Sequence, residues 1–136
     1  MGAPVPAGDS AFSPAQQGRL QRAVQQAETQ TGLCFTLVVG PIAGDPREQV
    51  ERALARVADG RPVGAVVVLV DPGGRQLEIA TTPVARRRVD DQACALVALS
   101  MTSSFSVGDL VGGLINGLRM LADAAGQGSP DRQLAG

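Results

Sequence analysis

Three arginines followed by two aspartates form the densest group of chemically capable residues in this chain. Arg86, Arg87 and Arg88 lead, after one valine, into Asp90 and Asp91. Guanidinium groups bind phosphate and carboxylate groups through paired hydrogen bonds, so the three arginines are candidates for binding a phosphate or a carboxylated partner. The alternative is a solvated charge run that the following aspartates neutralise.

Asp90 and Asp91 are also candidate metal ligands. Adjacent carboxylates supply the oxygen ligands that hard cations such as Ca²⁺ or Mg²⁺ prefer, and Asp59 is a weaker third candidate. The structural alternative is that Asp90 caps a helix and that Asp91 is an acid favoured by the dipole of the first helical turn.

Asp45 and Asp109 are a second possible pair of carboxylates, and each has a local role available. Asp45 precedes Pro46 and is followed three residues later by Glu48, which predicts a capping box at a helix start. Ser106 and Asp109 form an S-x-x-D pattern before an apolar run. We therefore expect both aspartates to act in capping rather than in catalysis.

The residue types that are missing exclude most enzyme mechanisms. The chain has no His, Lys, Tyr or Trp, so the usual general base, the Schiff-base former and the commonest metal ligand are absent. Cys34 lies in an apolar segment without a base, which predicts a buried and unreactive thiol. Thr102, Ser103 and Ser104 also lack an activating base and indicate a loop. No glycine-rich phosphate-binding motif, zinc motif or nucleophile elbow occurs.

Composition indicates one domain with an aliphatic core. The chain has 136 residues, of which 44% are hydrophobic and only 2% aromatic. A net charge of -1 gives no electrostatic attraction to nucleic acid or to an anionic membrane. Two cysteines, no basic leader and no segment long enough to span a bilayer predict a cytoplasmic protein.

Hydrophobic periodicity predicts seven elements. They are a helix beginning after Ser13, a buried strand within 33–39, a helix beginning after Asp45, a buried strand over 65–70, an alternating edge strand over 75–81, an apolar helix beginning at Asp90 and a final helix over about 110–118. The segment 90–101 is apolar on nearly every side, so we expect it to be covered on two sides. Gly113 and Gly117 lie four residues apart and predict a close approach to a neighbouring element.

This order of elements predicts an α/β fold, namely a three-layer α/β/α sandwich. Its small mixed sheet has two parallel strands plus an antiparallel edge strand, with helices on both faces. We expect one domain over 13–125 between a flexible N-terminus (1–12) and a flexible tail (126–136).

The predicted topology sorts the polar segments between the two ends of the sheet. Loop 40–45, turn 71–74 and the connection 103–109 are expected at the carboxyl ends of the parallel strands. Asp59, Arg61 and Asp90 are expected at the opposite end.

Four segments carry a family resemblance. They are "LVVGPIAGD", "VGAVVVLVDPGGRQLEIAT", "VDDQA" and "SFSVGDLVGGLINGLRML". Over Leu20 to about Ala124 the chain resembles the TPM domain family, named after a thylakoid lumen protein, a photosystem repair protein and a receptor modulator, and is most similar to an uncharacterised bacterial branch. The resemblance implies an α/β sandwich with an acidic groove for divalent cations, and weak acid phosphatase activity has been attributed to some members.

The chain departs from the family pattern near its expected metal site. The family has Asp-Asn-Gly before the central strand; Gly64 matches the glycine, whereas Pro62 and Val63 replace the Asp and Asn. Asp90 matches the aspartate that opens the next helix, and Gly108 with the following aspartate keeps the late Gly-Asp pair. The missing acid removes one implied metal ligand.

The sequence therefore favours a non-catalytic module that binds an unknown protein partner through the region from Arg86 to Asp91, with no cofactor. The alternative is a weak, divalent-metal-dependent acid phosphatase that uses Asp90 and Asp91, with Asp59, as ligands for Ca²⁺ or Mg²⁺.

Overall fold

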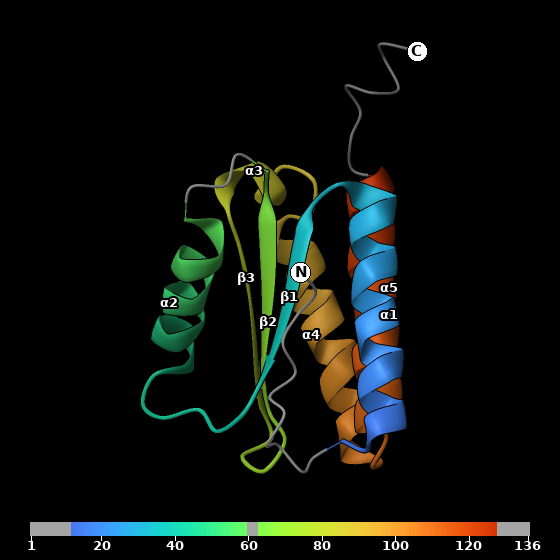
Figure 1. Cartoon of the computed structure of the whole chain (residues 1–136). Helices are drawn as coiled ribbons and strands as arrows, with labels where there is room; N and C mark the ends of the chain where they lie inside the picture. The colour runs from blue at the N-terminus through green and yellow to red at the C-terminus, as the bar shows by residue number, and fades with distance from the viewer. Residues whose placement is uncertain (1–11, 60–62, 128–136) are drawn as a thin grey trace.

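A three-stranded mixed sheet forms the centre of the protein (Figure 1). The computed structural model describes residues 12–59 and 63–127. Its strands are β1 (Cys34–Val39), β2 (Ala65–Asp71) and β3 (Gln76–Thr81), in the order β1-β2-β3. β1 is parallel to β2, and β3 is antiparallel to β2. This arrangement confirms the predicted parallel pair with an antiparallel edge strand.

Helices cover both faces of the sheet. α2 (Pro46–Ala58) packs on one face, and α1 (Pro14–Thr31), α4 (Asp91–Ser106) and α5 (Leu110–Gln127) pack on the other, as Figure 1 shows. The predicted three layers are thus confirmed. A short helix that the sequence pattern did not predict, α3 (Pro83–Arg86), connects β3 to α4.

The predicted helix starts are set by side-chain caps. Ser13 and Gln16 form a reciprocal capping box at α1. Asp90 accepts a hydrogen bond from the Ala93 N–H at 2.9 Å and thereby caps α4. Asp45 caps α2, but it accepts from the Arg47 N–H at 3.0 Å rather than from Glu48, so the D-x-x-E box is not formed.

The connection between α4 and α5 differs from the prediction. α4 continues to Ser106, whose hydroxyl donates to the Ser103 carbonyl at 2.7 Å. Asp109 itself caps α5 by accepting from the Gly112 N–H at 3.0 Å. The S-x-x-D box and a loop at 102–106 were therefore wrong, and only residues 107–109 of the predicted connection link the two helices. The hydroxyls of Thr102 and Ser106 bond to carbonyls within their own helix.

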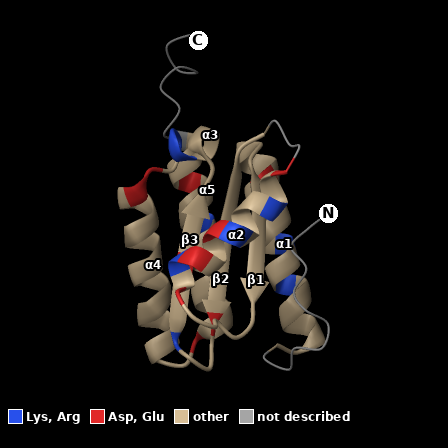
Figure 2. Cartoon of the chain, turned by 90° about the vertical axis from the view of Figure 1, so that its left-hand side faces the viewer, with Lys and Arg blue, Asp and Glu red and all other residues tan. Residues whose placement is uncertain are grey.

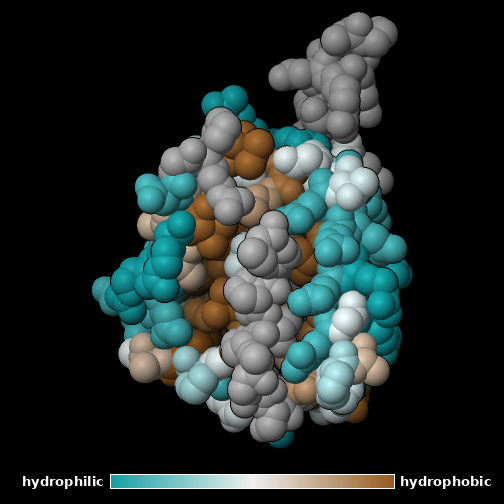
Figure 3. Space-filling model, in the orientation of Figure 1, coloured by the Kyte–Doolittle hydropathy of each residue, from teal (hydrophilic) through white to brown (hydrophobic). Residues whose placement is uncertain are grey.

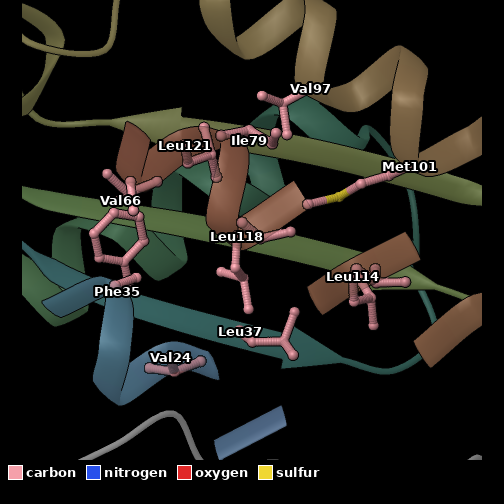
Figure 4. Close-up of a cluster of buried hydrophobic side chains, with 14 of the residues drawn as sticks. Val24, Phe35, Leu37, Val66, Ile79, Val97, Met101, Leu114, Leu118 and Leu121 are labelled. Carbon is pink, nitrogen blue, oxygen red and sulfur yellow. The ribbon is translucent and has the colours of Figure 1, made fainter. Parts of the chain in front are cut away.

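Two hydrophobic cores lie on the two faces of the sheet. Val50 and Leu54 of α2 pack on Val67 and Leu69 of β2. The larger core joins α1, α4 and α5 to the opposite face (Figure 4); its largest side chains include Phe35, Leu37, Met101, Leu114, Leu118 and Leu121. β2 is buried on both faces, which explains its unbroken run of apolar residues. Figure 3 shows apolar residues between α2 and α1, whose outer surfaces are hydrophilic.

α4 and α5 approach closely at two glycines, as predicted. A Cβ at Gly113 would lie 2.7 Å from Ser104 Cβ, and one at Gly117 would lie 2.7 Å from Met101 Cγ. Neither distance leaves room for a side chain, so the two glycines set the spacing of this helix pair.

One face of α4 is uncovered, contrary to the expectation that this helix is covered on two sides. Cys94, Val97 and Met101 are buried, but Leu96 is 58% exposed and Leu99 is 65% exposed. α4 lies at the outer side of its layer, where α5 packs against it and β3 lies beneath it. The sequence shows that the helix is apolar, but it does not show that the layer ends there.

The two ends of the sheet carry the segments assigned to them, except that Arg61 lies outside the described residues. The β1–α2 loop, the β2–β3 turn and the α4–α5 connection lie together at the carboxyl ends of β1 and β2, and α3 lies at the opposite end (Figure 1). Phe12 is buried in the core and α5 extends to Gln127, while residues 1–11 and 128–136 lie outside the described residues. Within the described ranges, no helix is both long and apolar enough to cross a membrane.

Candidate functional site

A groove runs along the outer edge of β3, between α2 and α4. Its volume is about 490 Å³. In Figure 2, α2 lies in front of the sheet and α4 lies beside β3. We call this cavity the β3 groove and define it by its lining residues: Arg47, Glu51, Leu77, Glu78, Ile79, Arg86, Asp91, Cys94, Ala95 and Ala98.

The floor of the β3 groove is a free backbone edge. The Thr82 N–H donates to the Ala65 carbonyl, and Val67 is paired with Ala80 in the same antiparallel ladder. Because the bonding direction alternates along such a ladder, Leu77, Ile79 and Thr81 direct their N–H and C=O groups away from β2. No further strand pairs with these groups in the described part of the chain.

Arg47 of α2 covers part of this edge. Its guanidinium donates to the Ile79 carbonyl at 3.1 Å and to Glu78 Oε1 at 3.2 Å. Two of its nitrogens also donate to Glu51 Oε2, at 3.1 and 2.9 Å. Partial burial lowers the pKa of Arg47, but the hydrogen bond and charge of Glu51, together with Glu78, outweigh burial and raise the pKa above its usual value. Arg47 is thus a cation on the α2 wall that has two acidic partners besides the Ile79 carbonyl.

Arg86 covers the other end of the edge with fewer partners. Its Nη2 donates to the Thr81 carbonyl at 2.9 Å, and its Nε donates to the Thr81 hydroxyl at 3.3 Å. The ion pair with Asp91 is long, at 3.8 Å, and the Arg86 side chain is 48% exposed. The guanidinium therefore depends mainly on the end of β3 for its hydrogen bonds.

Beyond Asp91, the exposed first residue of the helix, the α4 wall of the groove is small and apolar. Cys94, Ala95 and Ala98 line it beside Leu77 and Ile79. Burial, followed by the negative charges of the aspartates at the start of α4, raises the pKa of Cys94 to about 11. The thiol is therefore protonated at neutral pH and acts as a small hydrophobic group.

The structure divides the three predicted arginines among different roles. Arg86 lines the β3 groove, and Arg87 is exposed, with no side-chain partner among the described residues. Arg88 turns inward: its Nη1 donates to the Thr31 carbonyl at 2.8 Å, and its Nε donates to the Ala125 carbonyl at 3.3 Å. Arg88 thus ties the last turn of α1 to the last turn of α5, where cations are favoured by the helix dipoles.

The predicted metal ligands lie at the end of the sheet that carries α3. Asp90 caps α4, Asp91 is exposed beside Arg86, and Asp59 is exposed directly after α2. Across residues 12–59 and 63–127, no three acidic or cysteine side chains lie close enough together to hold one metal ion.

At the opposite end of the sheet, Asp71 joins two connections. Its carboxylate accepts from the Ile42 N–H at 3.0 Å and from the Gly74 N–H at 2.9 Å. These two backbone hydrogen bonds, the one from Ile42 first, lower the pKa of Asp71. Asp71 therefore holds the β1–α2 loop against the β2–β3 turn, a structural role.

The sequence pattern indicated Arg86 and Asp91 as site residues but gave no sign that Arg47, Glu51 and Glu78 line the same groove. The alternation of Leu77, Glu78 and Ile79 did indicate an edge strand. The position of Arg47 over that edge depends on how α2 crosses the sheet, which no local pattern reports.

The solved structures that share this fold include three determined by NMR. The NMR structure of BA42 protein from the psychrophilic bacterium Bizionia argentinensis matches with a TM-score of 0.73 and 12% identity, over 90% of this chain and 86% of that one. The N-terminal domain of a protein from P. gingivalis matches with a TM-score of 0.71 and 17% identity, over 85% and 76% of the two chains. The N-terminal domain of the cg2496 protein from Corynebacterium glutamicum matches with a TM-score of 0.63 and 17% identity, over 90% and 85%.

These identities are low, so the similarity to the three structures shows the fold alone. A family profile described as a domain of unknown function (DUF5130) matches residues 5–122, which include the whole sheet and every residue that lines the β3 groove. The chain therefore belongs to the DUF5130 family.

Proposed function

We propose that this protein is a non-catalytic binding module that receives an extended segment of a partner protein along the free edge of β3. The observation that carries the proposal is the outward backbone of Leu77 and Ile79 on the floor of a groove of about 490 Å³, an edge that continues to Thr81 beneath Arg86. Peptides that add a strand to such an edge obtain affinity from main-chain hydrogen bonds and specificity from pockets for alternate side chains.

The side chains that cover the edge are displaceable. Arg47 and Arg86 are both 48% exposed, so water can replace the carbonyl as the hydrogen-bond partner of each guanidinium group. A partner strand that takes over the carbonyls of Ile79 and Thr81 replaces two charge-assisted hydrogen bonds with regular backbone pairing. Charged side chains that cover an edge strand from neighbouring helices also limit indiscriminate pairing, which suits a site that accepts only a matching segment.

The shape of the groove favours a single segment over a second copy of this chain. α2 and α4 line the two sides of the groove, and β3 forms its floor. A second β3 would bring its own α2 and α4 against these two helices, whereas an isolated extended segment carries no such flanks. We therefore commit to an extended segment as the occupant.

Paired substitutions at Leu77 test the proposal. The Leu77 N–H points away from β2, so Leu77→Pro removes an outward donor without removing a ladder bond. Leu77→Ala is the matched control, because it loses the same side chain but keeps the N–H. Eight-residue peptides, selected from a random display library on the unaltered protein, should bind Leu77→Pro about five-fold more weakly than Leu77→Ala, as expected for one lost hydrogen bond.

Backbone amide NMR spectra give the location of binding. We expect the selected peptides to shift the amide signals of residues 76–81 and the adjoining residues of α2 and α4. Shifts confined to other surfaces, equal affinities of the two Leu77 variants, or a β3-paired dimer in sedimentation experiments would each overturn the proposal.

The metal-dependent phosphatase remains a second prediction, at Asp90, Asp91 and Asp59, as does the kinship with TPM domains that suggested it. We rank it below the binding module because the Asp90 carboxylate already caps α4 and Asp91 lies beside a guanidinium group. A cytoplasmic location also stays a prediction.

A further inference from the structure

We infer that the partner segment carries a carboxylate that binds Arg86 and apolar side chains that face α4. This inference rests on the proposed function of the β3 groove. It follows from the two walls of the groove and from the hydrogen bonds that an added strand would displace.

The pleat of β3 assigns each wall its side chains. Leu77 and Ile79 belong to the core that α1, α4 and α5 form, whereas Ala80 belongs to the α2 core and Glu78 bonds to Arg47 of α2. Side chains opposite one another in paired strands point to the same face of the sheet. Partner residues opposite Leu77 and Ile79 therefore face α4, and the residue between them faces α2.

The α4 wall selects apolar side chains. Cys94, Ala95 and Ala98 are all small, so they leave space above Leu77 and Ile79, and the Cys94 thiol is uncharged. Burying an apolar side chain against this wall removes hydrophobic surface from water on both partners. A valine, leucine or isoleucine at alternate positions of the segment fits this wall.

The α2 wall selects a polar side chain without a strong charge preference. Arg47 there already has Glu51 and Glu78 as partners, each within 3.2 Å. When a partner N–H takes over the Ile79 carbonyl, Arg47 still keeps both acids. No further carboxylate is required at this position.

Arg86, unlike Arg47, loses its shortest hydrogen bond when a partner strand is added and keeps only longer contacts. A partner N–H that binds the Thr81 carbonyl displaces the shortest hydrogen bond of Arg86, at 2.9 Å. The remaining contacts are the Thr81 hydroxyl at 3.3 Å and Asp91 at 3.8 Å. A carboxylate on the partner, near the residue opposite Thr81, restores a charge-assisted hydrogen bond to this guanidinium. We therefore expect a segment with an acidic residue near the position opposite Thr81 and apolar residues opposite Ile79 and Leu77.

A double-mutant cycle with synthetic peptides tests the inference. One peptide is an eight-residue binder selected on the unaltered protein. In the second peptide, the acidic residue expected near the position opposite Thr81 is replaced by its amide, Asp by Asn or Glu by Gln. On the unaltered protein we expect the amide peptide to bind about ten-fold more weakly, as for the loss of one charge-assisted hydrogen bond. On Arg86→Gln the two peptides should bind equally, because the carboxylate has lost its partner.

Arg87→Gln is the matched control. It removes the same charge one residue away, from a side chain that does not line the groove, and the ten-fold preference for the acidic peptide should persist. Circular dichroism spectra and melting curves of both variants establish that they are folded before affinities are compared.

Each outcome separates the inference from the proposed function. Peptides that shift the β3 amide signals but show no preference for the acid refute the inference and leave the groove as a binding site. If Arg86→Gln still binds the acidic peptide more tightly than the amide peptide, or if Arg87→Gln loses this preference to the same extent, Arg86 is not the residue that binds the carboxylate. Either result also refutes the inference. If no peptide shifts the β3 amide signals, the proposed function itself fails.

Discussion

Replacement of Arg88 tests whether this arginine joins α1 to α5 while the adjacent Arg87 has no structural role. Arg88→Met keeps the length of the side chain but removes its donors to the carbonyls of Thr31 and Ala125, at 2.8 and 3.3 Å. Hydrogen bonds from charged groups contribute about 1.5–3 kcal/mol each, and the longer one belongs at the lower end of that range. Arg88 Nη2 is buried with no hydrogen-bond partner among the described residues, and such an orphan costs about 1 kcal/mol or more.

The net expectation is a loss of about 2–3 kcal/mol in the free energy of unfolding on Arg88→Met. Arg87→Met is the control and should change stability by less than about 0.5 kcal/mol, because its side chain has no partner to lose. Urea unfolding followed by circular dichroism measures both values on the same scale. If the two variants were equally stable, Arg88 would not join α1 to α5, and the division of the arginines would have to be abandoned.

Three further predictions follow from the acids and the thiol. The native pKa of Asp71 is depressed, so the ionised carboxylate stabilises the fold fully above the unfolded pKa of about 3.9, and this stabilisation is lost as the pH falls through the native pKa. Asp71→Asn should therefore unfold at a lower urea concentration than the unaltered protein at neutral pH, and the difference between the two midpoints should close in acid. With its pKa near 11, Cys94 in a Cys34→Ser background should resist iodoacetamide at neutral pH, and mass spectrometry should detect its alkylation only in strong base or urea. Millimolar Ca²⁺ or Mg²⁺ should leave the melting temperature unchanged, whereas a rise that is lost when Asp90 and Asp91 are both changed to Asn would favour the phosphatase alternative.

Local signals in the sequence were sufficient to predict the architecture. The apolar run over 65–70 predicts a strand buried on both faces, and the alternation around Glu78 predicts a strand at an edge. Ser13, Asp45 and Asp90 mark helix starts because a short polar side chain satisfies free backbone donors there. These features depend on neighbours a few residues away, so they can be read without knowledge of the fold.

The candidate site depended on contacts between distant segments and was only partly predictable. Arg87 and Arg88 are adjacent and chemically identical, yet Arg88 binds carbonyls 57 and 37 residues away. Side chains of successive residues point in different directions, and the packing of the ends of α1 and α5 determines which guanidinium group hydrogen-bonds to their carbonyls. The exposure of Leu96 and Leu99 has the same origin, because it depends on where the helical layer ends.

The two outer strands of the sheet are protected by opposite charges, and this difference bears on which of them can accept a partner. On β1, the Phe35 N–H donates to Glu28 Oε2 of α1 at 2.9 Å, so an acid covers a donor. On β3, arginines cover the acceptors at Ile79 and Thr81. At β3 a carboxylate on the proposed segment competes with Glu78 and Asp91 for the arginines, whereas at Phe35 of β1 it is repelled by Glu28 of α1, so under the proposed function an acidic segment distinguishes the two edges. Changing Arg86 should therefore weaken the choice of edge as well as the affinity for the proposed segment.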